Sequence, residues 1–161
     1  MGMICALREV DEHKISALLL DPPSIHGFLA EEIGEVDLDK AWHGIHYLLT
    51  GQAEGGEEPF CYLLEGGEYI GDEDAGYGPA RALLPLQVRA WADALGGLTT
   101  DDLRQRLDPA AMTKAGIYPD IWARDAAEDD TPGYLLEYFE VLQSCVTQAA
   151  RENKGLIVYI C

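Results

Sequence analysis

The chain has 161 residues, 48% of them hydrophobic, and a formal net charge of −18. That length suits one globular domain with a core and is short for two. No apolar run approaches the roughly 20 residues that a membrane helix needs. The first residues lack the basic start and apolar stretch of a signal peptide. We therefore expect a single cytoplasmic domain over residues 1–161 that does not bind membranes.

The acidic charge is concentrated in one part of the chain. Residues 52–76, here called the acidic segment, contain no Lys or Arg and eight carboxylates: Glu54, Glu57, Glu58, Glu65, Glu68, Asp72, Glu73 and Asp74. Nucleic-acid binding relies on clustered Lys and Arg, so the composition argues against a nucleic-acid ligand. A cationic protein or a metal ion fits it better, although acidity can also serve solubility alone.

Motifs for catalysis or for a cofactor are missing from the sequence. The four cysteines are far apart, with no CxxC pair, and neither HExxH nor GxSxG occurs. The spacing Gly76-x-Gly78 is only a fragment of a dinucleotide fingerprint. The sequence therefore predicts no cofactor and favours a protein that is not an enzyme.

Hydrophobic periodicity and turn residues predict the elements in chain order. A strand is expected at residues 3–7, followed by a helix capped by Asp11 and another helix after Asp21. Next come a helix over 37–50 ended by Gly51 and a brief strand over 80–84. Between them, residues 51–79 form either a long loop or a loop interrupted by one small element at the apolar patch "FCYLL". Helices are then expected from Pro85, from Thr99–Thr100 and from Pro109. The longest helix starts at Pro132, capped by Thr131, and the last strand covers 156–160.

Helices fill the middle of this order and strands lie at both ends. Such an arrangement is typical of an α+β fold. We expect one domain in which the helix-rich middle packs on a small sheet that includes the N- and C-terminal strands.

The predicted helix 37–50 carries a histidine pair. On a helical wheel its core face holds four apolar side chains: Leu38, Trp42, Ile45 and Leu49. Asp39, His43 and His46 follow each other at spacings of four and three on a polar stripe, so neighbours can touch. One interpretation is that these three residues bind a metal ion. The other is that Asp39 pairs with a histidine and His46 packs at the edge of the core.

Several motifs together resemble the YfbM-like proteins, a bacterial family of unknown function. They are "DLDKAWHGIHYLLTG", "GYGPAR", "IYPDIW" and the ending "YLLEYFEVLQSCVTQAARENKGLIVYI". The resemblance implies a single-domain α+β fold and brings no activity or cofactor. It singles out Asp39, Lys40, Trp42, His46, Thr50, Gly51, Gly76, Tyr77, Gly78, Arg81, Tyr118, Pro119, Asp120 and Trp122.

Two functional hypotheses follow. The first is a non-enzymatic binding protein whose acidic surface engages a cationic partner. The second is a small enzyme or ligand-binding domain with a pocket around Asp39, His46, Arg81 and Asp120, assisted by a metal in one version. Aromatic residues favoured in contacts complete the predicted binding set, which comprises Asp39, Trp42, His46, Arg81, Tyr118, Asp120 and Trp122. The IYPDIW turn is either a recognition loop or a plug on the core.

Overall fold

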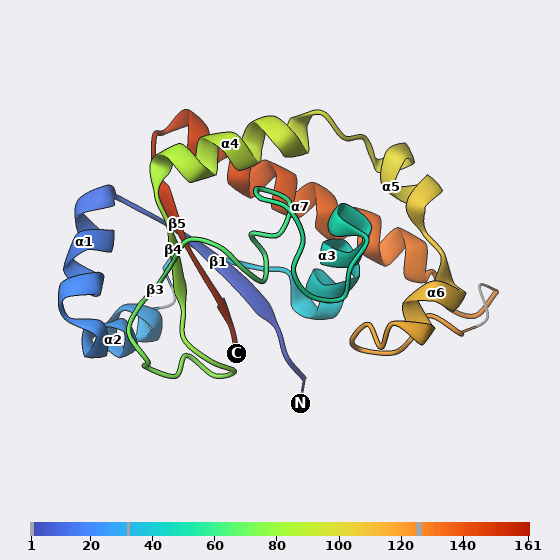
Figure 1. Ribbon diagram of the computed structural model, residues 1–161, viewed down its shortest axis with the longest axis horizontal. Coiled ribbons are helices and arrows are strands. Elements are labelled where there is room, and N and C mark those ends of the chain that lie inside the picture. The colour runs from blue at the N-terminus through green and yellow to red at the C-terminus, as the bar shows by residue number, and fades with distance from the viewer. Residues whose placement is uncertain (1, 32, 125–126) are drawn as a thin grey trace.

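The computed structural model describes residues 2–31, 33–124 and 127–161. Its centre is an antiparallel sheet in the order β2-β1-β5-β4-β3 (Figure 1). The strands are β1 (Cys5–Val10), β2 (Glu35–Asp37), β3 (Glu68–Tyr69), β4 (Arg81–Leu83) and β5 (Gly155–Ile160). The last strand therefore lies in the middle of the sheet, between the first strand and β4.

The helices account for most of the remaining regular structure. They are α1 (Glu12–Leu20), α2 (Ile25–Ala30), α3 (Trp42–Thr50), α4 (Pro85–Gly96), α5 (Thr100–Arg106), α6 (Pro109–Lys114) and α7 (Thr131–Arg151). Two 3-10 turns, η1 (Pro22–Ser24) and η2 (Asp39–Ala41), precede α2 and α3. In the described parts of the chain, no helix is both long and apolar enough to cross a membrane.

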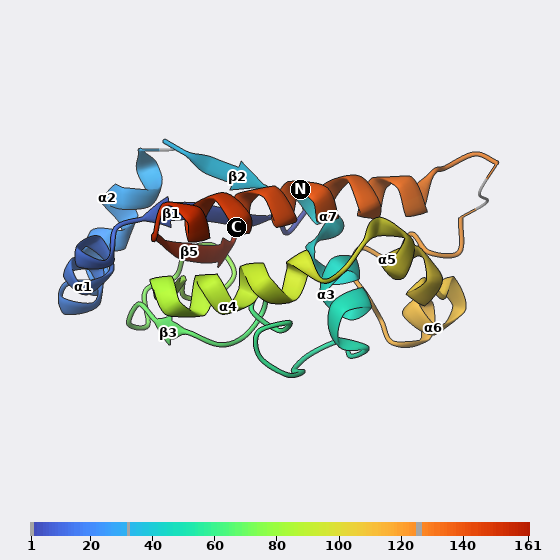
Figure 2. The same ribbon diagram turned by 90° about the horizontal axis from the view of Figure 1, so that it is seen from above.

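The sheet separates two hydrophobic cores, because successive strand side chains point to opposite faces. On β1, Cys5 and Leu7 face the larger core with α3, α4 and α7, while Ala6 and Val10 face a smaller core with α1 and α2. Figures 1 and 2 agree that α4 and α7 lie side by side over one face, with α1 and α2 at the other. The expected α+β fold, with both terminal strands in one sheet, is confirmed.

The region predicted as one helix over 37–50 folds differently at its start. Asp37 ends β2, and Asp39 has a φ of 48° at the beginning of η2. The α-helix itself begins only at Trp42 and ends at Thr50. Gly51 follows it with a φ of 75°, the left-handed conformation that glycine adopts easily. Asp39 therefore lies before the α-helix, where the helical wheel does not apply. The prediction that Asp39 shares a polar stripe of one helix with His43 and His46 is wrong.

The two outer strands were not predicted from the sequence. β2 has three residues and β3 has two, both largely exposed, so neither shows the alternating pattern of a strand packed on a core. The cap of the longest helix also differs from expectation by one residue. Asp130, not Thr131, accepts the hydrogen bond from Gly133 N, at 3.1 Å.

Candidate functional site

Aromatic and polar side chains from three segments meet at Trp42, the first residue of α3. The Trp42 ring stacks on His43 with ring centroids 5.0 Å apart and on Tyr118 at 5.7 Å. Its Nε1 donates to the Met3 carbonyl at 2.9 Å, and Met3 N donates to the Tyr118 hydroxyl at 2.9 Å. The N-terminal residues, α3 and the IYPDIW turn are therefore held together at this point.

His43 links the same turn to the start of the acidic segment. Its Nδ1 accepts from Tyr118 N at 2.8 Å, and its Nε2 lies 2.8 Å from the Ala53 carbonyl. A backbone N–H can only donate and a carbonyl can only accept, so the proton of His43 is on Nε2. Both ring nitrogens are occupied by the backbone, which gives His43 a structural role here.

Asp39 faces α7 rather than a histidine. Its Oδ2 accepts from the Tyr134 hydroxyl at 2.7 Å, and that hydroxyl accepts from Lys40 N at 3.1 Å. Burial, and then the hydrogen bond to Asp39, raise the pKa of the Tyr134 phenol. The phenol therefore stays protonated and ties η2 to the first turn of α7.

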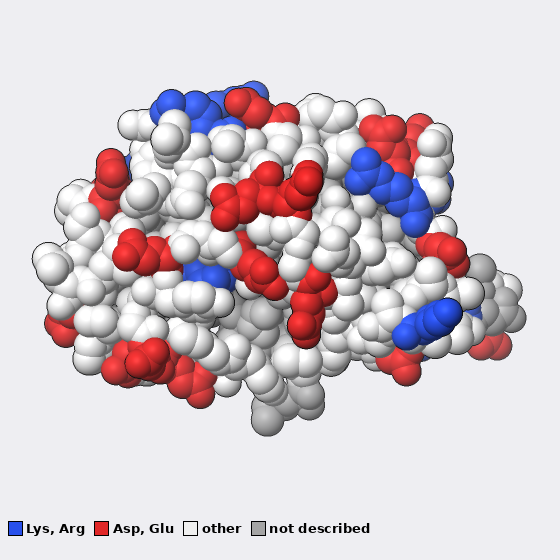
Figure 3. All heavy atoms as spheres, viewed as in Figure 1, with Lys and Arg blue, Asp and Glu red and all other residues white. Residues whose placement is uncertain are grey.

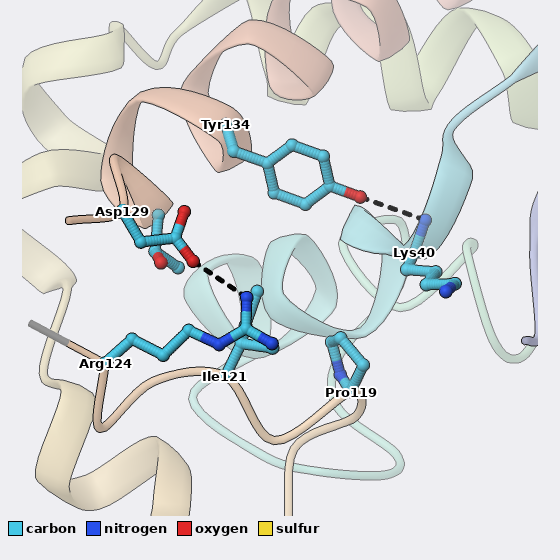
Figure 4. Close-up of a pocket in the computed structure, with 7 residues that line it drawn as sticks. Lys40, Pro119, Ile121, Arg124, Asp129 and Tyr134 are labelled. Atoms are coloured by element: carbon cyan, nitrogen blue, oxygen red, sulfur yellow. Dashed lines mark hydrogen bonds and ion pairs between the residues drawn. The ribbon is translucent and has the colours of Figure 1, made fainter.

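A cleft of about 420 Å³ opens beside this linkage. Its lining residues come from η2, the IYPDIW turn, the irregular stretch after that turn and the start of α7: Lys40, Pro119, Ile121, Arg124, Asp129, Thr131 and Tyr134. Figure 4 shows the Tyr134 ring along one side and Arg124 reaching toward Asp129. Those two charged groups are 2.8 Å apart. A cleft of this size with a few polar groups on an apolar wall can hold a small molecule.

The other residues of the IYPDIW turn differ in exposure. Trp122 is buried, and its Nε1 donates to the Ile117 carbonyl at 2.8 Å. Asp120 has a φ of 63° and an exposed side chain, and its backbone N–H donates to the same carbonyl at 3.0 Å. Tyr118 and Trp122 thus fold onto the core, while Pro119 and Ile121 line the cleft.

His46 is in a different environment from His43. It is completely buried, and within the described residues neither ring nitrogen makes a hydrogen bond of good geometry, although the Gly55 backbone lies near enough to raise its pKa slightly. Burial, with a smaller contribution from nearby His43, lowers its pKa from the usual 6.5 to about 4. His46 is therefore a neutral core residue at neutral pH.

Arg81 is a buried cation on β4, with only 5% of its surface exposed. Its guanidinium donates to the carbonyls of Tyr62 at 2.9 Å, Leu63 at 2.7 Å and Gly66 at 3.0 Å. Across the described ranges it makes no ion pair with a carboxylate. Arg81 therefore anchors the acidic segment to the sheet through backbone carbonyls.

Six of the seven predicted binding residues thus fall in two places. Asp39, Trp42 and Tyr118 lie together beside the cleft, with Trp122 buried behind them. The electrostatic influence of Arg81 reaches His46, and both residues are buried beneath the acidic segment, away from the cleft lining. Asp120 lies at the surface of the IYPDIW turn.

The metal interpretation of Asp39, His43 and His46 is not supported by their geometry. Asp39 binds Tyr134, His43 binds two backbone groups, and His46 is turned into the core. Over the part of the chain that the structure describes, no group of three His, Cys, Asp or Glu side chains could hold a metal ion.

The sequence did not point to three cleft residues: Arg124, Asp129 and Tyr134. The first two lie in an irregular stretch with no pattern. The sequence did contain a signal for Tyr134. It lies four residues before Tyr138 in the predicted longest helix, a spacing that puts two aromatic rings on the same helix face. Their rings are in edge contact, with centroids 5.1 Å apart.

Comparison with known proteins identifies the family. The model of a domain of unknown function, DUF1877, matches residues 1–159. Protein YfbM of Escherichia coli (strain K12) is 24% identical over 168 residues, covering 99% of both chains. The crystal structure of YfbM, described as a protein of unknown function, matches with a TM-score of 0.78 over 98% of this chain and 99% of that one. At 24% identity this match shows a shared fold. The chain therefore belongs to the DUF1877 family of YfbM-like proteins, as its motifs indicated.

Proposed function

We propose that this protein is a non-enzymatic binding protein whose acidic segment engages a cationic protein. The observation that carries the proposal is the exposure of the segment's charges. Seven of its eight carboxylates are exposed; the eighth, Glu73, is half-buried and pairs with His26 at 2.9 Å. Over the described residues none is paired with Lys or Arg. Figure 3 shows acidic atoms across the middle and lower left of this face.

The acidic segment is also held in a fixed shape, which supports a role in recognition. Arg81 binds three of its carbonyls, and Glu65 accepts from Gly55 N at 2.8 Å. Asp74 accepts from Gly76 N at 2.8 Å and Gly78 N at 3.1 Å, which lowers the pKa of its carboxyl. An ordered surface loses less conformational entropy when a partner binds.

Two exposed tyrosines add contact area to this acidic surface. Tyr69 is 56% exposed and Tyr77 58%, and both line a small hollow of about 150 Å³ with Arg81. Tyrosine is enriched in protein interfaces because it offers a large rigid ring and a polar tip. Acidic and tyrosine side chains on one face are complementary to a basic protein surface.

Affinity capture at two salt concentrations tests the proposal. The immobilised protein should retain a basic protein from a cell extract at low salt and release it as ionic strength rises, because salt screens exposed charges. The variant Glu54→Gln/Glu57→Gln/Asp72→Asn should capture far less of that protein. Its matched control, Glu12→Gln/Glu31→Gln/Asp93→Asn, removes three exposed acids elsewhere and should capture it normally. Equal loss in both variants, or no capture at low salt, would contradict the proposal.

A second candidate is small-molecule binding at the cleft, favoured by its volume of about 420 Å³ and by Arg124 at its wall. It replaces the four-residue pocket considered from the sequence with one centred on Tyr134 and Arg124. A thermal-shift screen of small carboxylic acids and amino acids tests it. A true ligand should raise the melting temperature of the wild type and not that of Arg124→Gln. A screen without any shift would reject this candidate.

A further inference from the structure

The opposite edge of the sheet from the acidic segment's strand β3 is formed by β2. β2 pairs with β1 on one side through Ala6↔Asp37, Leu7↔Val36 and Arg8↔Glu35. No other strand in the described chain lies on its outer side. An edge of this kind offers unpaired backbone groups to another chain.

The register shows which backbone groups are free. Leu38 N donates to the Cys5 carbonyl at 2.9 Å, so Cys5 and Leu38 form a hydrogen-bonded pair. Bonded and non-bonded pairs alternate in an antiparallel ladder, so Val36 bonds to Leu7 and the backbone of Glu35 and Asp37 points outward. Within the described residues, no backbone hydrogen bond to either outward pair is found. β2 thus presents two N–H and two C=O groups.

A groove lies beside this edge, between β2 and α7. Its volume is about 460 Å³, and it is lined by Val36, Glu137, Glu140, Val141, Ser144, Cys145 and Gln148. The helical residues follow a spacing of three and four, so they form one face of α7. A strand added to β2 would extend the sheet over this face, as in β-strand addition.

Charge decides which chain fits. Glu137 and Glu140 are exposed, and in the described parts of the chain neither pairs with a cation. Burial raises the pKa of the Tyr138 phenol, and the nearby carboxylates of Asp39, Asp37 (on the edge itself) and Glu137 raise it further. A second copy of this chain would bring the same acids to the edge and be repelled, since like charges across an interface are costly. Lysine or arginine side chains would instead meet unpaired carboxylates.

The geometry points to the β2–α7 groove as a docking site for an extended cationic segment of another protein, which adds to the sheet as a strand next to β2. This inference rests on the proposed function in that it assumes a cationic partner. It adds the β2–α7 groove as a second contact surface and an extended strand as the partner's conformation. Alternate basic side chains would reach Glu137 and Glu140, with the aliphatic stems of these same side chains packing on Val36 and Val141. The residues between them would point to the opposite face of the sheet.

Fluorescence anisotropy with a labelled seven-residue peptide, Thr-Lys-Val-Lys-Val-Lys-Thr, tests the inference. The comparison peptide has N-methyl groups on its three central residues, which remove strand donors and keep every charge. We expect the N-methylated peptide to bind at least about tenfold more weakly, because it loses up to two hydrogen bonds to the β2 carbonyls and its methyl groups prevent close approach to the edge. Amide hydrogen exchange at Glu35 and Asp37 should slow only with the unmodified peptide. Equal binding of the two peptides would overturn the inference.

Two variants of equal charge separate this inference from the proposed function. Glu137→Gln/Glu140→Gln should weaken binding of the unmodified peptide about fivefold or more, and Glu57→Gln/Asp72→Asn should leave it within about twofold. All four residues are exposed, so both variants should keep the fold, which circular dichroism checks. Loss only in the second variant, or no peptide binding, would overturn the groove inference. The proposed function is tested separately by the capture experiment, whose result does not depend on peptide binding at the groove.

Discussion

Polar groups on the two sides of α3 are bonded in different ways. On the cleft side, Asp39, Trp42 and His43 each bind a partner in another segment. Beneath the acidic segment, and within the described residues, His46 makes no hydrogen bond of good geometry, and Arg81 is held by three backbone carbonyls. The first side joins segments by specific polar contacts, and the second depends on a buried cation and a neutral imidazole.

This difference shows how little sequence spacing says about shared roles. His43 and His46 are three residues apart on one helix, yet one bridges two loops and the other is a core residue. The side of α3 with buried ionisable groups should respond to pH and to loss of charge. The cleft side should respond to loss of single hydrogen bonds and to changes in packing.

The largest effect is expected at Arg81. In Arg81→Met, three carbonyls lose their donor, so we expect a loss of about 3 kcal/mol in the free energy of unfolding. Urea unfolding measures it. Arg89→Met is the matched control, because Arg89 is exposed and its one side-chain hydrogen bond among the described residues is to Asn153; it should change stability by less than about 0.5 kcal/mol. Similar losses in both variants would show that Arg81 does not anchor the acidic segment.

His46 should make stability depend on pH. Its pKa is near 6.5 in the unfolded chain and about 4 in the fold, so the unfolded state takes up the proton first. The stability present above pH 6.5 should therefore fall by about 2 kcal/mol as the pH approaches 4. His46→Leu should lack this component. Urea unfolding at pH 7 and at pH 4.5 gives the loss of unfolding free energy for the wild type and for the variant. The difference between the two losses is the contribution of His46, and equal losses would exclude it.

Gly44 should be sensitive to size on the cleft side. A Cβ there would lie 2.7 Å from Leu135 Cδ2 and 2.8 Å from Trp122 Cη2. Gly44→Ala should therefore cost about 2 kcal/mol through overpacking. Gly27→Ala, in α2, meets nothing within 4 Å and should instead stabilise by about 0.5 kcal/mol. Thermal unfolding of both variants compares them; a neutral Gly44→Ala would mean that α3 moves freely against Trp122.

The smallest effect is expected at Tyr134. Tyr134→Phe removes the hydroxyl that joins Asp39 to Lys40 N and should cost about 1 kcal/mol. Tyr138→Phe is the control, because in the parts of the chain described here its hydroxyl has no hydrogen bond, and it should be close to neutral. If the two variants unfold at the same urea concentration, the linkage between η2 and α7 contributes nothing to stability.

Local patterns predicted the long elements and not the contacts between them. The stripe of α7 and the apolar run of β5 were readable because core burial imposes their periodicity. β2 and β3 were missed because short exposed strands carry no such pattern. The cleft was missed because Tyr134 and Asp39, which are 95 residues apart, meet only in the fold.

The central position of β5 has a consequence for synthesis on the ribosome. β1 forms its longest pairing with β5, from Cys5↔Ile160 to Val10↔Gly155. Residues 5–10 are made early and residues 155–160 late, so one edge of β1 remains unpaired while most of the chain emerges. Closing a sheet across such a separation is slow compared with local pairing. The nascent chain therefore exposes an apolar strand edge. Chaperones that recognise extended segments can bind β1 until residues 155–160 are available to pair with it.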